Sequence, residues 1–429
     1  MKKANFFAFF LTIFFIGVDT ANARNLSLDT TVALVMEQSN DVKKAAANIE
    51  KMRAALNAAH SGRFPKIDAT AAYQTNLFEL PIQTSLQPGS TMPHMNIGTA
   101  GLSASMPIYT FGKIGYALDM ARNGLKLAET SKRLAEIEIR AAAIHIYWAA
   151  KMTDEMVKIA ERALKNTRSA QSKLTATGRA NRSNIVKISA DVAAREIDLE
   201  DAKFNRDSAF RMLKAYAGIT EEEPVALTTE FPESFQSVKA NRPSPLEWDI
   251  YEMQAKIHDA EKWQNYTGYL PTIAATAKYD YLAFSDRAGN LVDDPLMNTK
   301  AASVGVGLQW TLFDGGSKRA GATMGAMSAI MAREDLDKSK RFKTAEYNDL
   351  IQNHAHLIKQ LKDLKTATDL AERAYKLSTA RFLAGQTSAT ELSDVERSMS
   401  QMEMAVLTAK LKILTAAENI KKFEAGINK

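Results

Sequence analysis

Few side chains in this sequence have the types and spacing that chemistry requires. His354 and His356 are two residues apart, and on a helix this spacing points the two rings in different directions, so they do not make a metal pair. Met92, His94 and Met95 form a cluster of soft ligands in an expected loop, where copper binding is a minor alternative. The sequence has no Gly-x-Ser-x-Gly, P-loop or zincin spacing. We therefore predict no enzyme, no cofactor and no bound metal.

Two acidic residues have the spacing of a shared site. Glu391 and Asp394 are three residues apart near the start of an expected helix that follows a turn at Gly385. On a helix this spacing places both carboxylates on one face. The alternative is that acidic residues in a first helical turn complement the helix dipole. The choice between these interpretations depends on the elements that position the pair.

A duplication organises those elements. Three landmarks recur in the same order, at an offset of about two hundred residues. Residues 64–73 match 270–279, residues 107–112 match 311–316, and the turn at Gly178 matches the turn at Gly385. We therefore predict that the chain is a duplicated helix–strand–strand–helix unit, in which each copy provides two strands.

Four segments alternate between apolar residues and polar or small residues, at about 66–74, 97–109, 271–284 and 301–313. In the last of them, Val304 and Val306 share one face while Gly305 and Gly307 share the other. Alternation is also typical of a half-buried strand in a soluble protein. However, the length of the segments suits a tilted transmembrane strand, and aromatic residues gather near their ends. We interpret them as membrane strands.

The rest of the chain has helical periodicity. We expect helices from Ser27 to about residue 62, from Gly112 to about residue 174, and from Gly316 to about residue 382, with return helices at about 184–217 and 388–424. Each long helix should measure roughly 90 to 100 Å at 1.5 Å per residue. Apolar and small residues at heptad spacing predict coiled-coil packing, in which the methionines fill the core.

The N-terminal segment has the layout of a secretory signal peptide. Lys2 and Lys3 precede an apolar run from residue 6 to residue 18, and the small residues Ala21 and Ala23 precede a cleavage site after Ala23. The run is shorter than the roughly 20 residues that span a bilayer as a helix. Because no Cys follows it, we do not expect an acylated lipoprotein.

The composition argues against a nucleic-acid-binding protein and against a disulfide-stabilised one. Without Lys2, Lys3 and Asp19, the 55 basic and 49 acidic residues become 53 and 48, a net charge of +5. This charge is too small and too dispersed to predict nucleic-acid binding. The chain has no Cys, so stability must come from packing and assembly rather than from disulfides.

The strand count makes a prediction about assembly. Strands cross a membrane only in a closed barrel, because their backbone groups find no water in lipid. Four strands cannot close a barrel, since about eight is the working minimum. Three copies of the chain in a cyclic homotrimer would supply twelve. The predicted fold class is therefore an α+β membrane protein whose four strands per chain join a trimeric 12-stranded barrel, continued by a long antiparallel coiled-coil helical barrel.

These residues resemble the TolC-like outer-membrane efflux proteins over nearly the whole mature chain. The likeness rests on the repeat and on short motifs: Pro65 and Pro271 at the helix-to-strand entries, residues 107–112 and 312–316 at the barrel exits, and residues 381–385 at a hairpin tip. The resemblance implies an exit duct that runs from the periplasm through the outer membrane of a Gram-negative cell. It divides the chain into a signal peptide (1–23), a first repeat (24–217), a linker (218–243) and a second repeat (244–429).

The resemblance also implies site residues. Acidic residues of the second-copy tip ring the closed entrance in this family, and the matching positions are Glu391 and Asp394. In a trimer they would make a ring that attracts cations. The expected tip turns and adaptor contacts are Gly178, Arg179, Arg182, Arg381, Phe382 and Gly385, and the expected barrel exits are Pro107, Gly112, Gly315 and Gly316.

The contacts that close the entrance in the family are not matched here. Asn184 stands where the first-copy tip can offer an acidic partner, and Phe382 and Thr387 stand at the usual Tyr and Arg positions. Opening of the duct should therefore be controlled differently. Arg179, Arg182 and Lys187 form a basic group that would suit an adaptor or the neighbouring acidic tip, although a solvated loop is the alternative.

The resemblance implies three kinds of partner: copies of the same chain in outer-membrane lipid, a periplasmic adaptor, and an inner-membrane pump or ATP-driven exporter. The function is then passive export, by efflux or by type I secretion. The alternative is a soluble periplasmic coiled-coil adaptor without a pore. An adaptor should lack four alternating segments with aromatic ends, so the strands distinguish the two hypotheses.

Overall fold

A computed structural model describes residues 23–75, 80–81, 91–92, 96–176, 182–285 and 299–426. Almost all of the expected signal peptide lies outside these residues. The chain divides into two compact units. Unit 1 contains residues 1–39, 138–239 and 350–419, and unit 2 contains residues 40–137, 240–349 and 420–429. Each unit therefore takes segments from both halves of the sequence.

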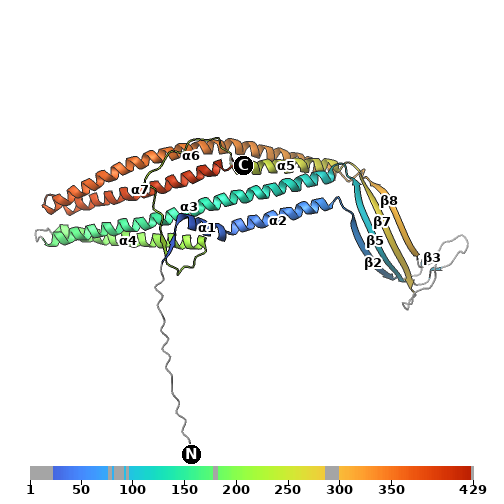
Figure 1. The fold of residues 1–429 in the computed structure, drawn as a ribbon, viewed down its shortest axis with the longest axis horizontal. Helices are drawn as coiled ribbons and strands as arrows, with labels where there is room; N and C mark the ends of the chain where they lie inside the picture. Colours follow the sequence, from blue (N-terminus) through green and yellow to red (C-terminus); the bar gives the residue numbers. More distant parts are fainter. Residues whose placement is uncertain are drawn as a thin grey trace, which may run out of the picture. The chain divides into compact units, whose positions relative to one another are not determined.

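Unit 2 contains a four-stranded antiparallel sheet (Figure 1). Its strands are β2 (Lys66–Thr75), β5 (Asn96–Tyr109), β7 (Thr272–Ser285) and β8 (Thr299–Gln309), in the order β2-β5-β7-β8. The strand pair of one repeat thus lies beside the strand pair of the other. A small separate pair joins β3 (Leu80–Pro81) to β4 (Thr91–Met92). Four alternating segments of the sequence are confirmed as strands.

The register divides the sheet into an apolar face and a polar face. Ile67 pairs with Ala104, Ala104 with Ala277, and Ala277 with Val304. The face that contains them is almost entirely apolar: Ile67, Ala69, Ala71, Tyr73, Ala100, Leu102, Ala104, Met106, Ile273, Ala275, Ala277, Tyr279, Tyr281, Ala302, Val304, Val306 and Leu308. The opposite face is mostly polar or glycine: Lys66, Asp68, Thr70, Gln74, Thr99, Gly101, Ser103, Ser105, Thr276, Lys278, Asp280, Ser303, Gly305 and Gly307. The apolar face is exposed within the single chain, with Val304 at 87% and Val306 at 70%.

The strand β8 ends at Gln309, so the prediction that it reaches residue 313 is wrong. The indole Nε1 of Trp310 donates to the backbone oxygen of Tyr269 at 3.0 Å. Further on, the Asp314 carboxylate accepts from the backbone nitrogens of Gly316 at 3.1 Å and Lys318 at 2.9 Å. The residues after Gln309 thus form hydrogen bonds at the start of the next helix instead of continuing the pairing of β8 with β7.

Prolines and left-handed residues mark the changes between helix and strand. Pro65 and Pro271 come directly before β2 and β7. On the return, the chain passes through two consecutive residues with positive φ in each repeat: Phe111 (52°) and Gly112 (90°), then Gly315 (68°) and Gly316 (92°). Pro107 lies at an irregularity in the β5–β7 register, a place where a missing N–H is tolerated.

The helices of unit 2 are α2 (Asn40–Ser61), α5 (Leu246–Thr267) and parts of α3 (Lys113–Ala176) and α6 (Ser317–Leu383). The helices α5 and α6 approach each other closely at Gly325, where a Cβ would lie 3.1 Å from the Lys262 Cα atom. Arg333 on α6 also pairs with Asp259 on α5 at 2.7 Å. None of the helices that the structure describes is long and apolar enough to span a membrane.

Unit 1 contains α1 (Leu28–Gln38), α4 (Arg182–Ala217), all but the last turn of α7 (Ala389–Glu424) and the remainder of α3 and α6. The predicted single helix from Ser27 to about residue 62 is wrong, because it breaks at Ser39. There the backbone leaves the helical region, with ψ at 115°, a conformation that a short polar side chain favours over helix. Ser27 caps α1 through Thr30 as the sequence indicates. A parallel pair of β1 (Arg24–Leu26) and β6 (Val225–Leu227) was not predicted.

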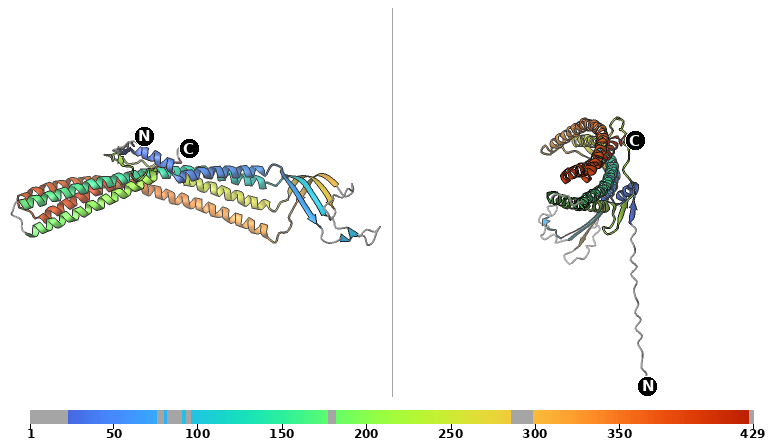
Figure 2. Two further views of the ribbon diagram at one scale, coloured as in Figure 1. Left: turned by 90° about the horizontal axis from the view of Figure 1, so that it is seen from below. Right: turned by 90° about the vertical axis from the view of Figure 1, so that its left-hand side faces the viewer.

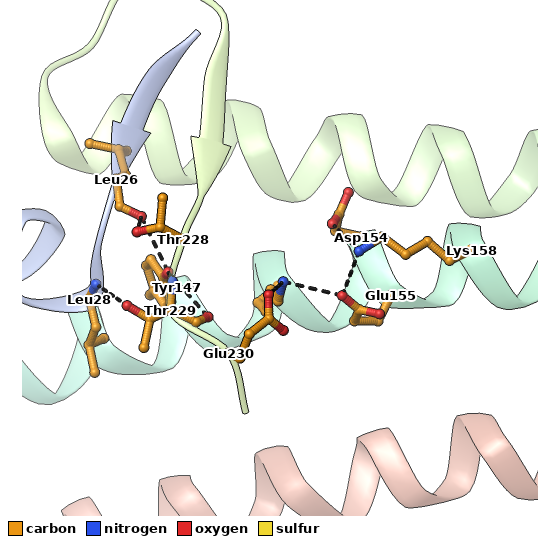
Figure 3. A network of polar contacts seen from close by, with 10 residues as sticks. Leu26, Leu28, Tyr147, Asp154, Glu155, Lys158, Thr228, Thr229 and Glu230 are labelled. Carbon is orange, nitrogen blue, oxygen red and sulfur yellow. Dashed lines mark hydrogen bonds and ion pairs between the residues drawn. The ribbon is translucent and has the colours of Figure 1, made fainter. Parts of the chain in front are cut away.

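Two buried tyrosines, one from each long helix, hold the linker between the repeats at two places. In unit 1 the Tyr147 hydroxyl accepts from the backbone nitrogen of Thr229 at 2.8 Å and donates to the Leu26 oxygen at 3.3 Å (Figure 3). In unit 2 the Tyr347 hydroxyl accepts from the backbone nitrogen of Asn241 at 2.9 Å. Both rings are at most 1% exposed. The residues called a linker are therefore an ordered part of the fold.

An ion-pair network lies beside the hydrogen bonds of Tyr147 (Figure 3). The Lys151 ammonium contacts Glu230 at 2.7 Å and Glu155 at 3.2 Å, and Lys158 contacts Glu155 at 2.7 Å. Burial alone would lower the pKa of Lys151, but the two carboxylates reverse this effect and raise it. Burial would likewise raise the pKa of Glu155, and its two lysine partners lower it instead. The network therefore stays charged at neutral pH.

Two helical hairpins, α3 with α4 and α6 with α7, lie side by side in unit 1 (Figure 2). The core between α6 and α7 contains Leu357, Leu361, Ala409, Ile413 and Ala416. Another cluster joins α3 and α4 to α1 and β1, and includes Leu26, Val35, Ala143, Ala150 and Leu213. The long helices and return helices that the sequence predicts are confirmed, with bounds within a few residues.

Candidate functional site

The tip of the second hairpin begins with a tight helix end. Gly385 has φ of 73°. Its nitrogen donates to the Phe382 oxygen at 3.0 Å, and the next nitrogen, of Gln386, donates to the Arg381 oxygen at 2.9 Å. This pair of bonds is the Schellman motif, which needs a left-handed residue and therefore favours glycine. The turn predicted at Gly385 thus has a definite backbone geometry.

The next helix begins at a serine cap, and Glu391 belongs to it. The Ser388 hydroxyl accepts from the Glu391 nitrogen at 3.2 Å. The Glu391 carboxylate accepts a hydrogen bond from the Thr387 hydroxyl and lies 3.8 Å from the Arg381 guanidinium. Acidic residues at this position stabilise a helix start. Glu391 therefore has a local structural role as well as a place at the tip.

Asp394 differs from Glu391 although both lie on α7. Its side chain is exposed, and no hydrogen bond or ion pair joins it to any residue in the part of the chain that the structure describes. Thr387, which stands at an expected Arg position, bonds to Glu391. Of the two tip carboxylates, Asp394 is thus the one that remains available.

An apolar cluster lies behind the tip. Phe382 packs with Ile188, Ala389 and Leu392, and is 7% exposed. A tyrosine at this position would bring a hydroxyl that needs a partner, whereas phenylalanine fits an apolar core. Asn184 is half-buried in the first turn of α4. Apolar packing around Phe382 therefore holds this tip together within the chain.

The first hairpin tip is only partly described. Arg182 is exposed at the start of α4, whereas Gly178 and Arg179 lie outside the described residues. His94 and Met95 of the soft-ligand cluster lie outside them too. His354 is buried and its pKa is lowered by burial, while His356 is exposed, so the two rings point apart as their spacing predicts. Within the described ranges no cluster of three metal-binding side chains occurs.

The sequence analysis missed a buried ion pair between the two hairpins. Arg195 on α4 contacts Glu396 on α7, with 2.5 Å between Nη2 and Oε2. Only 8% of one side chain and 3% of the other is exposed. The Ser400 hydroxyl lies 3.1 Å from the second Glu396 oxygen, and Asp198 lies 3.2 Å from Arg195. The available signal was a charge at a core position: Arg195 follows Ile188 and Val192 at heptad spacing, and all three are buried.

Burial and ion pairing shift the pKa of Glu396 in opposite directions. Burial raises the pKa of Glu396, and Arg195 and Ser400 counteract only part of that effect. Next to the pair lies a cavity of about 470 Å³, lined by residues of α3, α4 and α7. Its wall includes Ile159, Ala163, Arg195, Ser400 and Met404. The pair thus separates the apolar tip cluster from a loosely packed region.

Comparison with known proteins identifies the family. The model of the family described as "Outer membrane efflux protein" matches residues 32–219 and 250–424. The chain is similar to "Probable outer membrane lipoprotein SilC" of Salmonella typhimurium, with 21% identity over 403 residues that cover 90% of this chain and 83% of the relative.

Two crystal structures have the same fold. The CmeC outer membrane channel of Campylobacter jejuni gives a TM-score of 0.82 at 15% identity and covers 93% of this chain and 85% of its own. A membrane protein from Pseudomonas aeruginosa gives 0.80 at 17% identity, with coverage of 92% and 89%. Such likenesses show the fold, and the family match covers most of the sequence. The chain belongs to the outer membrane efflux protein family, and it is a non-enzymatic efflux channel protein of the Gram-negative outer membrane that extends into the periplasm.

Proposed function

We propose that three copies of this chain form a passive exit duct whose barrel has twelve strands. The observation that carries the proposal is the sheet of unit 2. One face is apolar and uncovered, the other is polar, and β2 and β8 are edge strands of the four-stranded sheet. Lipid would cover the apolar face, and copies of the chain would pair the edges, because an unpaired edge is not tolerated in lipid.

Apolar positions on two helices of unit 1 support the assembly. Val186, Ile197 and Phe204 on α4 are each more than 60% exposed, and so is Leu377 on α6, while Leu370 is 59% exposed. Within each helix these positions share one face. Since isolated exposed apolar stripes are unfavourable in water, we expect α4 of one copy to pack against α6 of the next. A soluble adaptor would explain these stripes but not the sheet.

The duct would operate with two further partners. We expect its helical tips, which include Arg182 and Arg381, to contact a periplasmic adaptor. The adaptor would connect the duct to an inner-membrane pump or ATP-driven exporter. Cargo would be chosen by the pump, because a passive duct contacts cargo only transiently.

The entrance of the duct would be lined by the acidic tip. Three copies of Glu391 and Asp394 would place six carboxylates around one constriction, where crowded negative charge attracts cations. Asp394 should contribute more than Glu391, since Thr387 and Arg381 already engage Glu391. The ring therefore predicts cation selectivity.

Assembly is tested in outer-membrane fractions. Electrophoresis of unheated samples should show a trimer that dissociates on heating, as expected of a closed barrel. A soluble periplasmic monomer would reject the duct and leave the adaptor hypothesis. Purified trimers should then conduct ions in planar lipid bilayers.

The entrance is tested by Asp394→Ala and Glu391→Ala. We expect Asp394→Ala to lower cation selectivity or raise single-channel conductance, and Glu391→Ala to do so less, because its charge is partly offset within the tip. Asp369→Ala is the control, since this exposed carboxylate lies on α6 away from the tip. If Asp394→Ala and the double variant both match the wild-type values, the ring assignment is rejected.

A further inference from the structure

The pair Arg195–Glu396 connects the two hairpins of unit 1 near the proposed entrance. Arg195 comes from the return helix of the first repeat and Glu396 from the return helix of the second. Another ion pair joins the same hairpins, Arg162 with Glu403 at 2.6 Å, but 52% of the Arg162 side chain is exposed. Solvent and salt weaken an exposed pair far more than a buried one. Arg195–Glu396 is therefore the less screened contact of the two.

The surroundings of the pair differ on its two sides. Towards the tip, Ile188 and Leu392 pack in the apolar cluster with Phe382. Away from the tip, α3, α4 and α7 line the cavity of about 470 Å³, which is partly open to solvent. Few side chains have to be unpacked for α7 to shift at the cavity, because a void contributes no contacts that would be lost. The ion pair thus lies at the border between the apolar cluster and the cavity.

The contact is also one that can be released. Taking two charges out of water costs free energy, and the attraction between them offsets this cost only in part or by a small margin. The raised pKa of Glu396 has burial as its largest cause, which fits such a balance. Once the helices separate, water can solvate both groups. The pair therefore gives a defined geometry in the packed state at little net cost to separation.

We propose that Arg195 and Glu396 are positioning residues that hold the tip of hairpin α6/α7 against hairpin α3/α4 and so set the width of the duct entrance. Glu396 is two residues from Asp394 on the same helix, and a helix moves as a rod over this length. Displacement of Glu396 therefore displaces the carboxylate at the entrance. The statement about the entrance rests on the proposed function, whereas the restraint between the hairpins does not.

The restraint is tested by a distance measurement in the full-length protein. The chain has no Cys, so Ala193→Cys on α4 and Ser398→Cys on α7, both exposed, give two specific spin-label sites. Pulsed electron paramagnetic resonance then reports the separation of the hairpins. Arg195→Met removes the counter-ion of Glu396, and we expect the distances to become longer and broader and the single-channel conductance to rise.

Two further variants separate positioning from general stability. Arg162→Met makes the same change in the exposed pair and should keep wild-type distances and conductance. The exchange Arg195→Glu with Glu396→Arg should return both readouts towards the wild-type values, incompletely because Asp198 then faces a carboxylate. Wild-type distances in a folded Arg195→Met protein would overturn the proposal, and so would an exchange variant that behaves no better than Arg195→Met.

If Arg195→Met does not assemble, Arg195→Lys provides a second test of the restraint. Arg195→Lys keeps the charge, but it replaces the two guanidinium nitrogens, of which Nη2 contacts Glu396 and Nη1 contacts Asp198, by a single nitrogen on a more flexible stem. Longer distances in Arg195→Lys support the restraint, and unchanged distances reject it. If no protein conducts, including the wild type, the channel function fails while the spin-label distances still decide the restraint.

Discussion

At the scale of single residues, the two strand-to-helix turns show how the repeats solve one problem with different side chains. Gly315 and Gly316 adopt positive φ without steric cost, whereas the first repeat has Phe111 and Gly112 at the matching places. A left-handed residue with a side chain is strained by about 1–2 kcal/mol. The Phe111 ring packs edge-on against Tyr109, with 4.6 Å between ring centroids, and this contact offsets some of the strain.

We expect Gly112→Ala to lower the free energy of unfolding by about 1–2 kcal/mol, because φ is positive there. A Cβ at Gly112 would also lie 3.1 Å from the Tyr116 ring. The matched control is Gly115→Ala, three residues on in α3, where a Cβ meets nothing within 4 Å. It should stabilise the helix by up to about 1 kcal/mol. Thermal unfolding in detergent measures both, and equal effects of the two variants would contradict the interpretation.

At the scale of elements, the linker becomes part of the fold because side chains of the long helices satisfy its backbone. The backbone nitrogens of Thr229 and Asn241 both donate to buried tyrosine hydroxyls. An extended segment without a ladder partner needs such bonds, since a buried N–H without an acceptor is costly. The charged contacts of Lys151 then hold the segment beyond Thr229.

The contacts of Tyr147 predict that Tyr147→Phe destabilises the chain by about 1–3 kcal/mol, since it removes the acceptor of the partly buried Thr229 N–H. Tyr216→Phe is the control, because Tyr216 is 44% exposed and its hydroxyl makes no hydrogen bond with the described residues. Hydrogen exchange should also accelerate at Thr229 in Tyr147→Phe alone. Unchanged exchange at Thr229 would show that the hydroxyl does not hold the linker.

At the scale of the whole molecule, a single chain is an incomplete structure. Its sheet has an uncovered apolar face and two edge strands, so the exposed Val304 and Leu308 are explained only by surroundings that the chain does not provide. Lipid and further copies of the chain are the surroundings that the proposed duct would supply. The family match and the sheet therefore support each other.

An arginine introduced on one or the other face of β8 tests which face meets lipid and which faces the interior of the barrel. We expect Val304→Arg to reduce heat-dissociable trimers in the outer membrane, because Arg on a lipid-exposed barrel face costs roughly 2–4 kcal/mol near the bilayer midplane. Ala301→Arg is the control on the polar face, where it would lie opposite Asp280. If both variants assemble equally well, the apolar face does not meet lipid.

Much of this architecture follows from the sequence because its signals are local. Periodicity, prolines and paired landmarks determine which segments are helices and strands, and two strands per repeat require assembly. The break at Ser39 and the β1–β6 pair were missed because a three-residue strand and a one-residue helix break have no periodicity. The family resemblance indicated Glu391 and Asp394, and nothing in the sequence told that Thr387 and Arg381 engage only one of them.

The sequence by itself determined the elements, the strand count and the family, because each depends on neighbouring residues or on repeated patterns. Only the tertiary structure decided which polar groups meet. Arg195 and Glu396 are 201 residues apart, and a charge at a heptad core position does not name its partner. The helices must first pack before two such side chains share a buried contact, and for that reason the restraint between the hairpins was visible only in the fold.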